Sequence, residues 1–176
     1  MFRNPAHKTA VHEAGHAVAT IHLDIPFEGI ELRIDAADGH WYCGGRLKGA
    51  ELPDLADNER LWAQLIVIMA GYAGTSVFEH ETAFSLREFT CVDDRDYSAA
   101  VDILRQFQPP VVEPTVLHTA MEQAWNDARQ LIIANRTTLA TISDELMRRS
   151  HPNGETLACH IMLTQQDLSR LLPSNR

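Results

Sequence analysis

The sequence predicts a single α+β domain that is mainly helical and carries a small β hairpin or sheet. Apolar residues recur at helical spacing along most of the chain, whereas residues 29–47 alternate apolar and charged side chains as a strand does. With 176 residues and 45% hydrophobic content, the chain can bury a sizeable core. We therefore expect one domain over residues 1–176, with a sub-boundary at 108–114 before a C-terminal helical part.

The first expected helix covers residues 8–22, because its apolar side chains fall on one helical face. Asp24 and Pro26 follow and end it. In the next segment Ile30, Leu32 and Ile34 alternate with charged residues, and the Asp-Gly pair at 38–39 precedes a second aromatic run. This segment predicts a β hairpin.

A long central helix is expected from Asp57 or Asn58, either of which can cap it, to about Glu79. Residues 61–78 carry no formal charge and approach the length that spans a membrane. Polar residues and two glycines dilute this run, and no basic cluster flanks it. We therefore expect a buried helix and no membrane association.

The rest of the chain is predicted to be helical between polar connections. Residues 81–95 are expected to form a loop, and a helix with one apolar stripe then runs from Asp96 to the Pro-rich segment at 109–114. A long helical stretch over 115–149 and a turn at 151–154 follow. After a short apolar segment, Thr164 and Asp167 can form the capping box of a last helix.

Charge and cysteine content limit the classes of function. The net charge of -9 and pI near 5.4 disfavour broad binding to nucleic acid or anionic membranes. Cys43, Cys91 and Cys159 are too widely spaced for a disulfide framework or a thiolate zinc site, and the N-terminus lacks the apolar run of a secretion signal. We expect a cytoplasmic protein with reduced cysteines.

The stretch "HEAGH" at 12–16 is the main indication of chemistry. His12 and His16 are four residues apart, about 40° around a helix axis, so both imidazoles can reach one metal ion. Glu13 lies beside the open metal position, where it can act as general base in peptide hydrolysis. The pattern arises by chance about 0.03 times in a chain of this composition. A helix with incidental histidines is the alternative.

A catalytic zinc site needs a third protein ligand. His22 matches the spacing of the metzincin motif, but Ala19 stands where that motif has glycine, and a continuing helix turns His22 about 120° away from His16. Glu79 is the nearest fit to a thermolysin-like glutamate ligand, although it lies at a helix end beside other charges.

Several segments together resemble the protease domain of the FtsH-type ATP-dependent zinc proteases. "HKTAVHEAGHAVA" at 7–19 contains that family's His-Glu-Ala-Gly-His-Ala motif. "MAGYAGTSVFE" is similar to the family's Gly-Gly-Arg-Ala-Ala-Glu-Glu helix, and "DRDYSAAVDIL" to its Asn-Asp-Leu segment. Later similarities follow in the family's order, so the resemblance covers nearly the whole chain, over residues 69–79, 94–104, 128–149 and 155–162.

The resemblance implies a zinc cofactor held by His12, His16 and Asp96, with Glu13 as the catalytic base. The residues themselves support Asp96 as the third ligand: Asp93 and Asp94 lie in the expected loop, whereas Asp96 begins a helix whose apolar stripe fixes its position. The chain departs from the family on the central helix, where an arginine and two acidic residues are replaced. The replacements are Tyr72, Thr75 and Ser76.

The resemblance implies a zinc-dependent metalloendopeptidase of the HExxH type. The sequence contains no P-loop, so we expect it to hydrolyse flexible polypeptides without an ATPase motor of its own. Substrates are expected to pair with the free edge of the hairpin near residues 42–45. The alternative is a non-catalytic metal- or peptide-binding regulatory module, and a homo-oligomer or a separate partner protein is compatible with either function.

Overall fold

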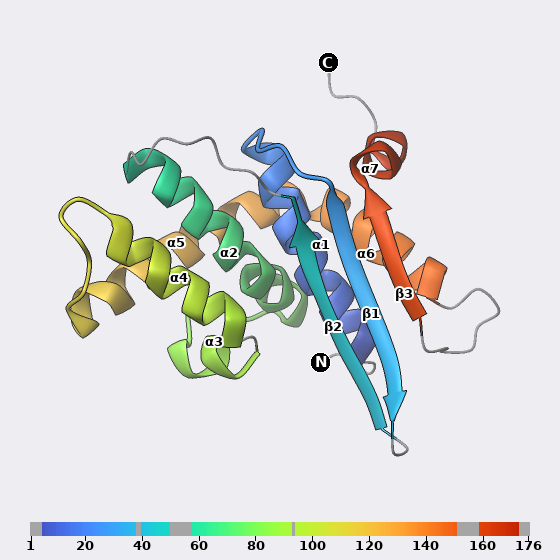
Figure 1. Cartoon of the computed structure of the whole chain (residues 1–176), viewed down its shortest axis with the longest axis horizontal. Coiled ribbons are helices and arrows are strands. Elements are labelled where there is room, and N and C mark those ends of the chain that lie inside the picture. Colours follow the sequence, from blue (N-terminus) through green and yellow to red (C-terminus); the bar gives the residue numbers. More distant parts are fainter. Residues whose placement is uncertain (1–4, 38–39, 50–57, 93, 151–158, 173–176) are drawn as a thin grey trace.

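The chain folds into a mainly helical α+β arrangement with a small antiparallel sheet at one end (Figure 1). The computed structural model describes residues 5–37, 40–49, 58–92, 94–150 and 159–172. The described elements are, in order, α1 (Pro5–His22), β1 (Gly29–Ala37), β2 (His40–Lys48), α2 (Asn58–Glu79), α3 (Leu86–Val92), α4 (Asp94–Gln106), α5 (Pro114–Ala134), α6 (Arg136–Ser150), β3 (Cys159–Thr164) and α7 (Gln165–Leu171). The structure therefore confirms a mainly helical α+β fold with a small sheet.

The sheet has the strand order β2-β1-β3, with both pairings antiparallel. Its inner face packs on α1, and the alternation noticed in the sequence puts Ile30, Leu32 and Ile34 there, fully buried. The opposite face carries charged side chains such as Glu31 and Arg33. Because β1 is central, β2 is an edge strand of the described sheet. The expected pairing of substrates with the hairpin near residues 42–45 needs such an edge.

Helices α1 and α2 cross closely at the centre of the fold. A Cβ on Gly15 would collide with the backbone carbonyl of Ala70, so only glycine permits this approach. Residues 69–77 of α2 are all buried, which confirms the predicted interior helix. Among the described helices, α2 alone has the length and apolar composition of a membrane span, but 67% of its most apolar window is buried inside this fold.

The structure differs from the predicted elements at four points, or defines them more finely. The expected loop at 81–95 contains α3, which is held by the buried side chain of Phe89 stacking on Tyr72, and α4 begins at Asp94 rather than Asp96. The helical stretch at 115–149 is two helices, separated at Asn135. The short apolar segment before the last helix is the edge strand β3, which is too short to show a clear alternation in the sequence.

The predicted helix ends are partly confirmed. Thr164 and Asp167 form the expected capping box of α7, with each side chain bonded to the other residue's backbone N–H. Pro114 begins α5, as its fixed φ favours. The expected turns at 38–39 and 151–154 and the candidate cap at Asp57 lie outside the described residues.

Candidate metal centre

The structure brings the three predicted ligands together. His12 and His16 lie on one face of α1 and are buried, and Asp96 reaches them from the first turn of α4. The two Nε2 atoms are 3.1 Å apart, and Asp96 Oδ2 lies 3.0 Å from His12 Nε2 and 3.2 Å from His16 Nε2. These three atoms form a nearly equilateral triangle that can hold one metal ion.

The dimensions of this triangle suit a small divalent metal. Donors about 2.0–2.1 Å from a tetrahedral ion are about 3.3 Å from one another, close to the separations between the histidine and aspartate atoms. Three donors also leave the fourth tetrahedral position open, which is the arrangement of a catalytic rather than a structural site. The chemistry of the donor set therefore fits a bound metal ion.

Backbone atoms orient one of the two imidazoles. His16 Nδ1–H donates to the carbonyl oxygen of Val67 on α2, at 2.8 Å, which directs Nε2 toward the metal position. The Nδ1 atom of His12 is buried and has no hydrogen-bond partner among the described residues. The ring of His12 is instead positioned by packing, in an edge contact with the ring of His16 at 4.7 Å between centroids.

The electrostatics of the site favour a bound cation. Burial lowers the pKa of His16, but Asp96 opposes this effect and raises that pKa to about 10. Burial raises the pKa of Asp96, but the two histidines outweigh it and hold that pKa well below its usual range. These opposite shifts favour a protonated His16 beside an ionised Asp96, and a metal ion bound there would compete with that proton.

Gly71 of α2 has no side chain, and this leaves room for the donor nitrogens of His12 and His16. A Cβ at this position would lie 2.5 Å from His16 Nε2 and 2.7 Å from His12 Nε2. Any larger residue would therefore press on both donor atoms. The sequence indicated small residues on this helix but did not identify this role, because it depends on how α2 crosses α1.

We expect Gly71→Ala to weaken metal binding by at least about tenfold, because the methyl group displaces both imidazoles from one ion. Metal content after dialysis and competition with a chromophoric chelator measure the effect. Gly74→Ala is the matched control: it lies on the same helix, and its Cβ would meet the Val11 carbonyl at 3.1 Å but no ligand atom. Equal metal affinity in Gly71→Ala and the wild type would contradict this role.

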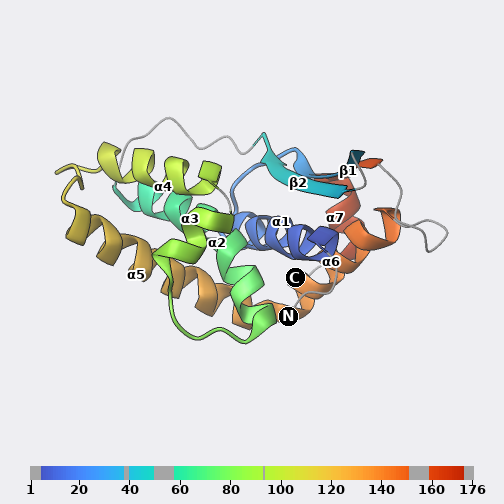
Figure 2. The ribbon, with the colours of Figure 1, turned by 90° about the horizontal axis from the view of Figure 1, so that it is seen from below.

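Glu13 lies beside the triangle, in a narrow cavity. It is 2% exposed and lines a cavity of about 200 Å³ together with His16 and Asp96. Residues of β2, α2 and the first turn of α4 complete its lining. In Figure 2, β2 lies over α1 and α4 lies over α2. Gly45 of β2 is packed so closely that a Cβ there would lie 2.5 Å from the carboxylate oxygen Oε1 of Glu13.

Comparison with models of known protein families and with curated proteins finds no match for this chain.

The two alternative third ligands, His22 and Glu79, lie elsewhere in the structure. His22 is exposed at the end of α1, and Glu79 pairs with Lys8 at 3.8 Å. Neither belongs to the group of donor atoms that the described residues bring together, whereas Asp96 does. Asp93 lies outside the described residues.

The substituted positions on the central helix are buried. Tyr72 packs among Phe84, Phe89 and Trp125, and its hydroxyl donates to Glu88. Tyr72, Thr75 and Ser76, the residues at these positions, are therefore part of the core of this chain. They leave the three donors and Glu13 in place.

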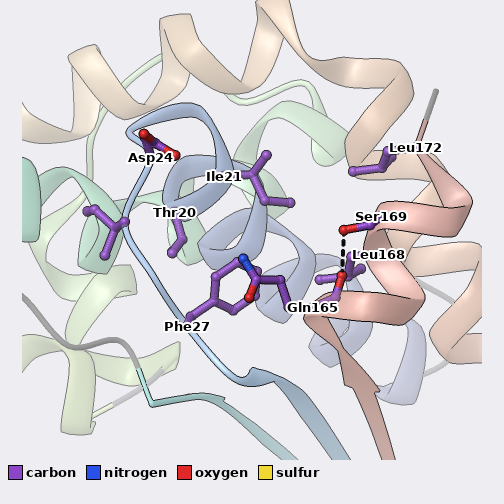
Figure 3. Close-up of a pocket in the computed structure, with 9 residues that line it drawn as sticks. Thr20, Ile21, Asp24, Phe27, Gln165, Leu168, Ser169 and Leu172 are labelled. Atoms are coloured by element: carbon purple, nitrogen blue, oxygen red, sulfur yellow. Dashed lines mark hydrogen bonds between the residues drawn. The ribbon is translucent and has the colours of Figure 1, made fainter. Parts of the chain in front are cut away.

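A second, larger cavity lies between the end of α1 and α7 and has a different character (Figure 3). Apolar and polar residues share its lining: Ile21, Phe27 and Leu168 face it, and Asp24 is the one ionisable side chain among the described residues that line it. The Ser169 hydroxyl, which also lines it, donates to the Gln165 carbonyl of the same helix. The described residues of this cavity form no set of groups for metal binding or hydrolysis.

Proposed function

We propose that this chain is a zinc-dependent metalloendopeptidase that hydrolyses peptide bonds in flexible polypeptides. The observation that carries the proposal is the triangle of two imidazole nitrogens and one carboxylate oxygen, all within 3.2 Å, with the buried Glu13 in the adjoining cavity. Zinc takes this type of donor set in catalytic sites. The order of motifs along the chain supports an FtsH-type peptidase fold.

Each residue has a distinct role in the proposed reaction. His12, His16 and Asp96 would hold the zinc, which supplies Lewis acidity and a water molecule with a pKa near 7. Glu13 accepts the proton of the attacking water at its carboxylate and returns it to the leaving amine. The cavity keeps Glu13 out of bulk solvent, so the proton passes between water and substrate within the site.

The edge strand β2 supports an extended polypeptide as substrate. Its outer edge forms no ladder with another described strand, and its residues Gly45–Leu47 line the cavity that contains Glu13. A substrate added as a further strand would therefore run past the metal, held by backbone hydrogen bonds that do not depend on its sequence. Only an unfolded segment can adopt this arrangement, so we expect flexible substrates.

The deciding experiment combines metal analysis with proteolysis. We expect the purified protein to contain one zinc per chain and to cleave casein or a quenched peptide. A chelator should abolish cleavage and added zinc should restore it, while ATP should have no effect. A protein that binds zinc and peptides but never cleaves them would instead be the regulatory module. Unchanged cleavage after complete removal of the metal would contradict both functions.

The packing of Gly45 against Glu13 leads to a separate prediction. Gly45→Ala should lower kcat/KM for peptide hydrolysis by roughly 10²-fold, because the methyl group displaces the catalytic carboxylate, while zinc content stays unchanged. Gly44→Ala adds the same methyl group one residue away, where nothing lies within 4 Å, and serves as the control. Equal rates for the two variants would show that Gly45 does not position Glu13.

A further inference from the structure

We infer that the site selects polypeptides with acidic residues next to the scissile bond, and that Arg46 and Arg95 bind those residues. This inference rests on the proposed peptidase function. Arg46 belongs to β2 and Arg95 to α4, and both residues are exposed. Both line the cavity that contains Glu13 and Asp96. A substrate lying along β2 would therefore pass close to two guanidinium groups.

A neighbouring pocket continues this cavity over the outer face of the sheet. It shares Arg46 and Arg95 with the first cavity and adds Arg33. Among the described residues of its lining, Glu31 is the one acidic residue, and it is 1% exposed. Arginines are thus gathered beside the site of a chain whose net charge is -9. Such a local concentration attracts anionic groups to the cavity.

The carboxylate of Glu31 is shared among several basic side chains. Arg46 Nε donates to Glu31 Oε2, His160 also bonds to this carboxylate, and Lys48 and Arg33 lie 3.8 Å from it. One buried carboxylate on the outer face of the sheet therefore faces three full positive charges.

The pairing with Glu31 also prepares Arg46 for a second carboxylate. The bond uses Nε only, and the terminal Nη groups of Arg46 have no hydrogen-bond or ion-pair partner among the described residues. Arginine presents its donors as a planar fork that fits a carboxylate. Because Glu31 already orders the side chain, less conformational freedom is lost when an acidic substrate residue binds.

Matched peptides test the selectivity. One quenched peptide is made with Glu, Gln or Lys on either side of the scissile bond, and kcat/KM is measured at low and high salt. We expect the Glu peptide to exceed the Gln peptide by about tenfold and the Lys peptide by more, with the difference shrinking at high salt. Equal rates for all three peptides would overturn the inference, although the proposed function would stand.

Arginine variants then assign the preference to these side chains. Arg95→Gln should reduce the Glu-to-Gln ratio to about threefold, and Arg46→Lys, which keeps a charge near Glu31, should also reduce it. Arg105→Gln, an exposed arginine in the last turn of the same helix, is the control and should leave the ratio unchanged. Zinc content and melting temperature show that each variant is folded. An unchanged ratio in Arg95→Gln and Arg46→Lys would overturn the assignment.

A binding measurement separates this inference from the proposed function. The Glu13→Gln variant should bind a fluorescent Glu peptide about tenfold more tightly than its Gln counterpart, as measured by anisotropy without turnover. If the variant shows this preference and the wild-type protein cleaves no peptide, the peptidase function is contradicted and the arginine site is supported. A DNA duplex that displaced the peptide at equal charge concentration would indicate a general polyanion site and contradict the inference.

Discussion

Glu13→Gln is expected to lower kcat for peptide hydrolysis by about 10²–10⁴-fold while zinc remains bound. The amide has nearly the same shape as the carboxylate, so it fits the same space against Gly45. It cannot accept a proton from the attacking water, whereas the three proposed ligands are unchanged. Zinc content by mass spectrometry of the metal and initial rates on a quenched peptide measure the two effects together.

Glu79→Gln is the matched control for this change. Glu79 pairs with Lys8 and lies outside the group of donor atoms, so its replacement should leave both zinc content and rate near the wild-type values. Wild-type hydrolysis by Glu13→Gln would mean that another group accepts the proton. Loss of zinc in Glu79→Gln would revive the hypothesis that a glutamate at the end of α2 is the third ligand.

The local part of the site was predictable, because the two histidines and Glu13 depend on one helix only. A spacing of four residues puts both imidazoles on one face whatever surrounds the helix. Asp96 depends on the packing of a separate helix, and the resemblance to a known protease family supplied it. The residue types of α4 supported the prediction, although the helix begins two residues earlier than expected.

Other parts of the site could not be predicted, because they depend on backbone atoms and on helix crossing. The carbonyl of Val67 orients His16, but a carbonyl is present at every residue and leaves no pattern in a sequence. The missing side chain of Gly71 makes room for the histidine donors only because α1 and α2 cross at this position. Likewise, β3 was missed because it pairs with β1, a strand far away in the chain, with Leu32 opposite Ile161.

Asp96→Asn is expected to weaken zinc binding by at least about tenfold and to abolish hydrolysis. Asp96 is the one anionic ligand of the triangle, and its Oδ2 lies 3.0–3.2 Å from both histidine nitrogens. An amide oxygen is a weaker ligand and carries no charge to balance the metal. The two histidines alone would leave the ion with two protein ligands, one fewer than catalytic zinc sites use. Competition with a chromophoric chelator measures the affinity.

Asp102→Asn is the control, because Asp102 lies on the same helix, is exposed and pairs with Arg105 on the surface. It should keep both zinc and activity, which would show that the loss in Asp96→Asn comes from the ligand and not from a general change in α4. His22→Ala should likewise retain zinc, since His22 is exposed at the end of α1. If Asp96→Asn binds zinc as the wild type does, and His22→Ala or Glu79→Gln does not, the third ligand is not Asp96.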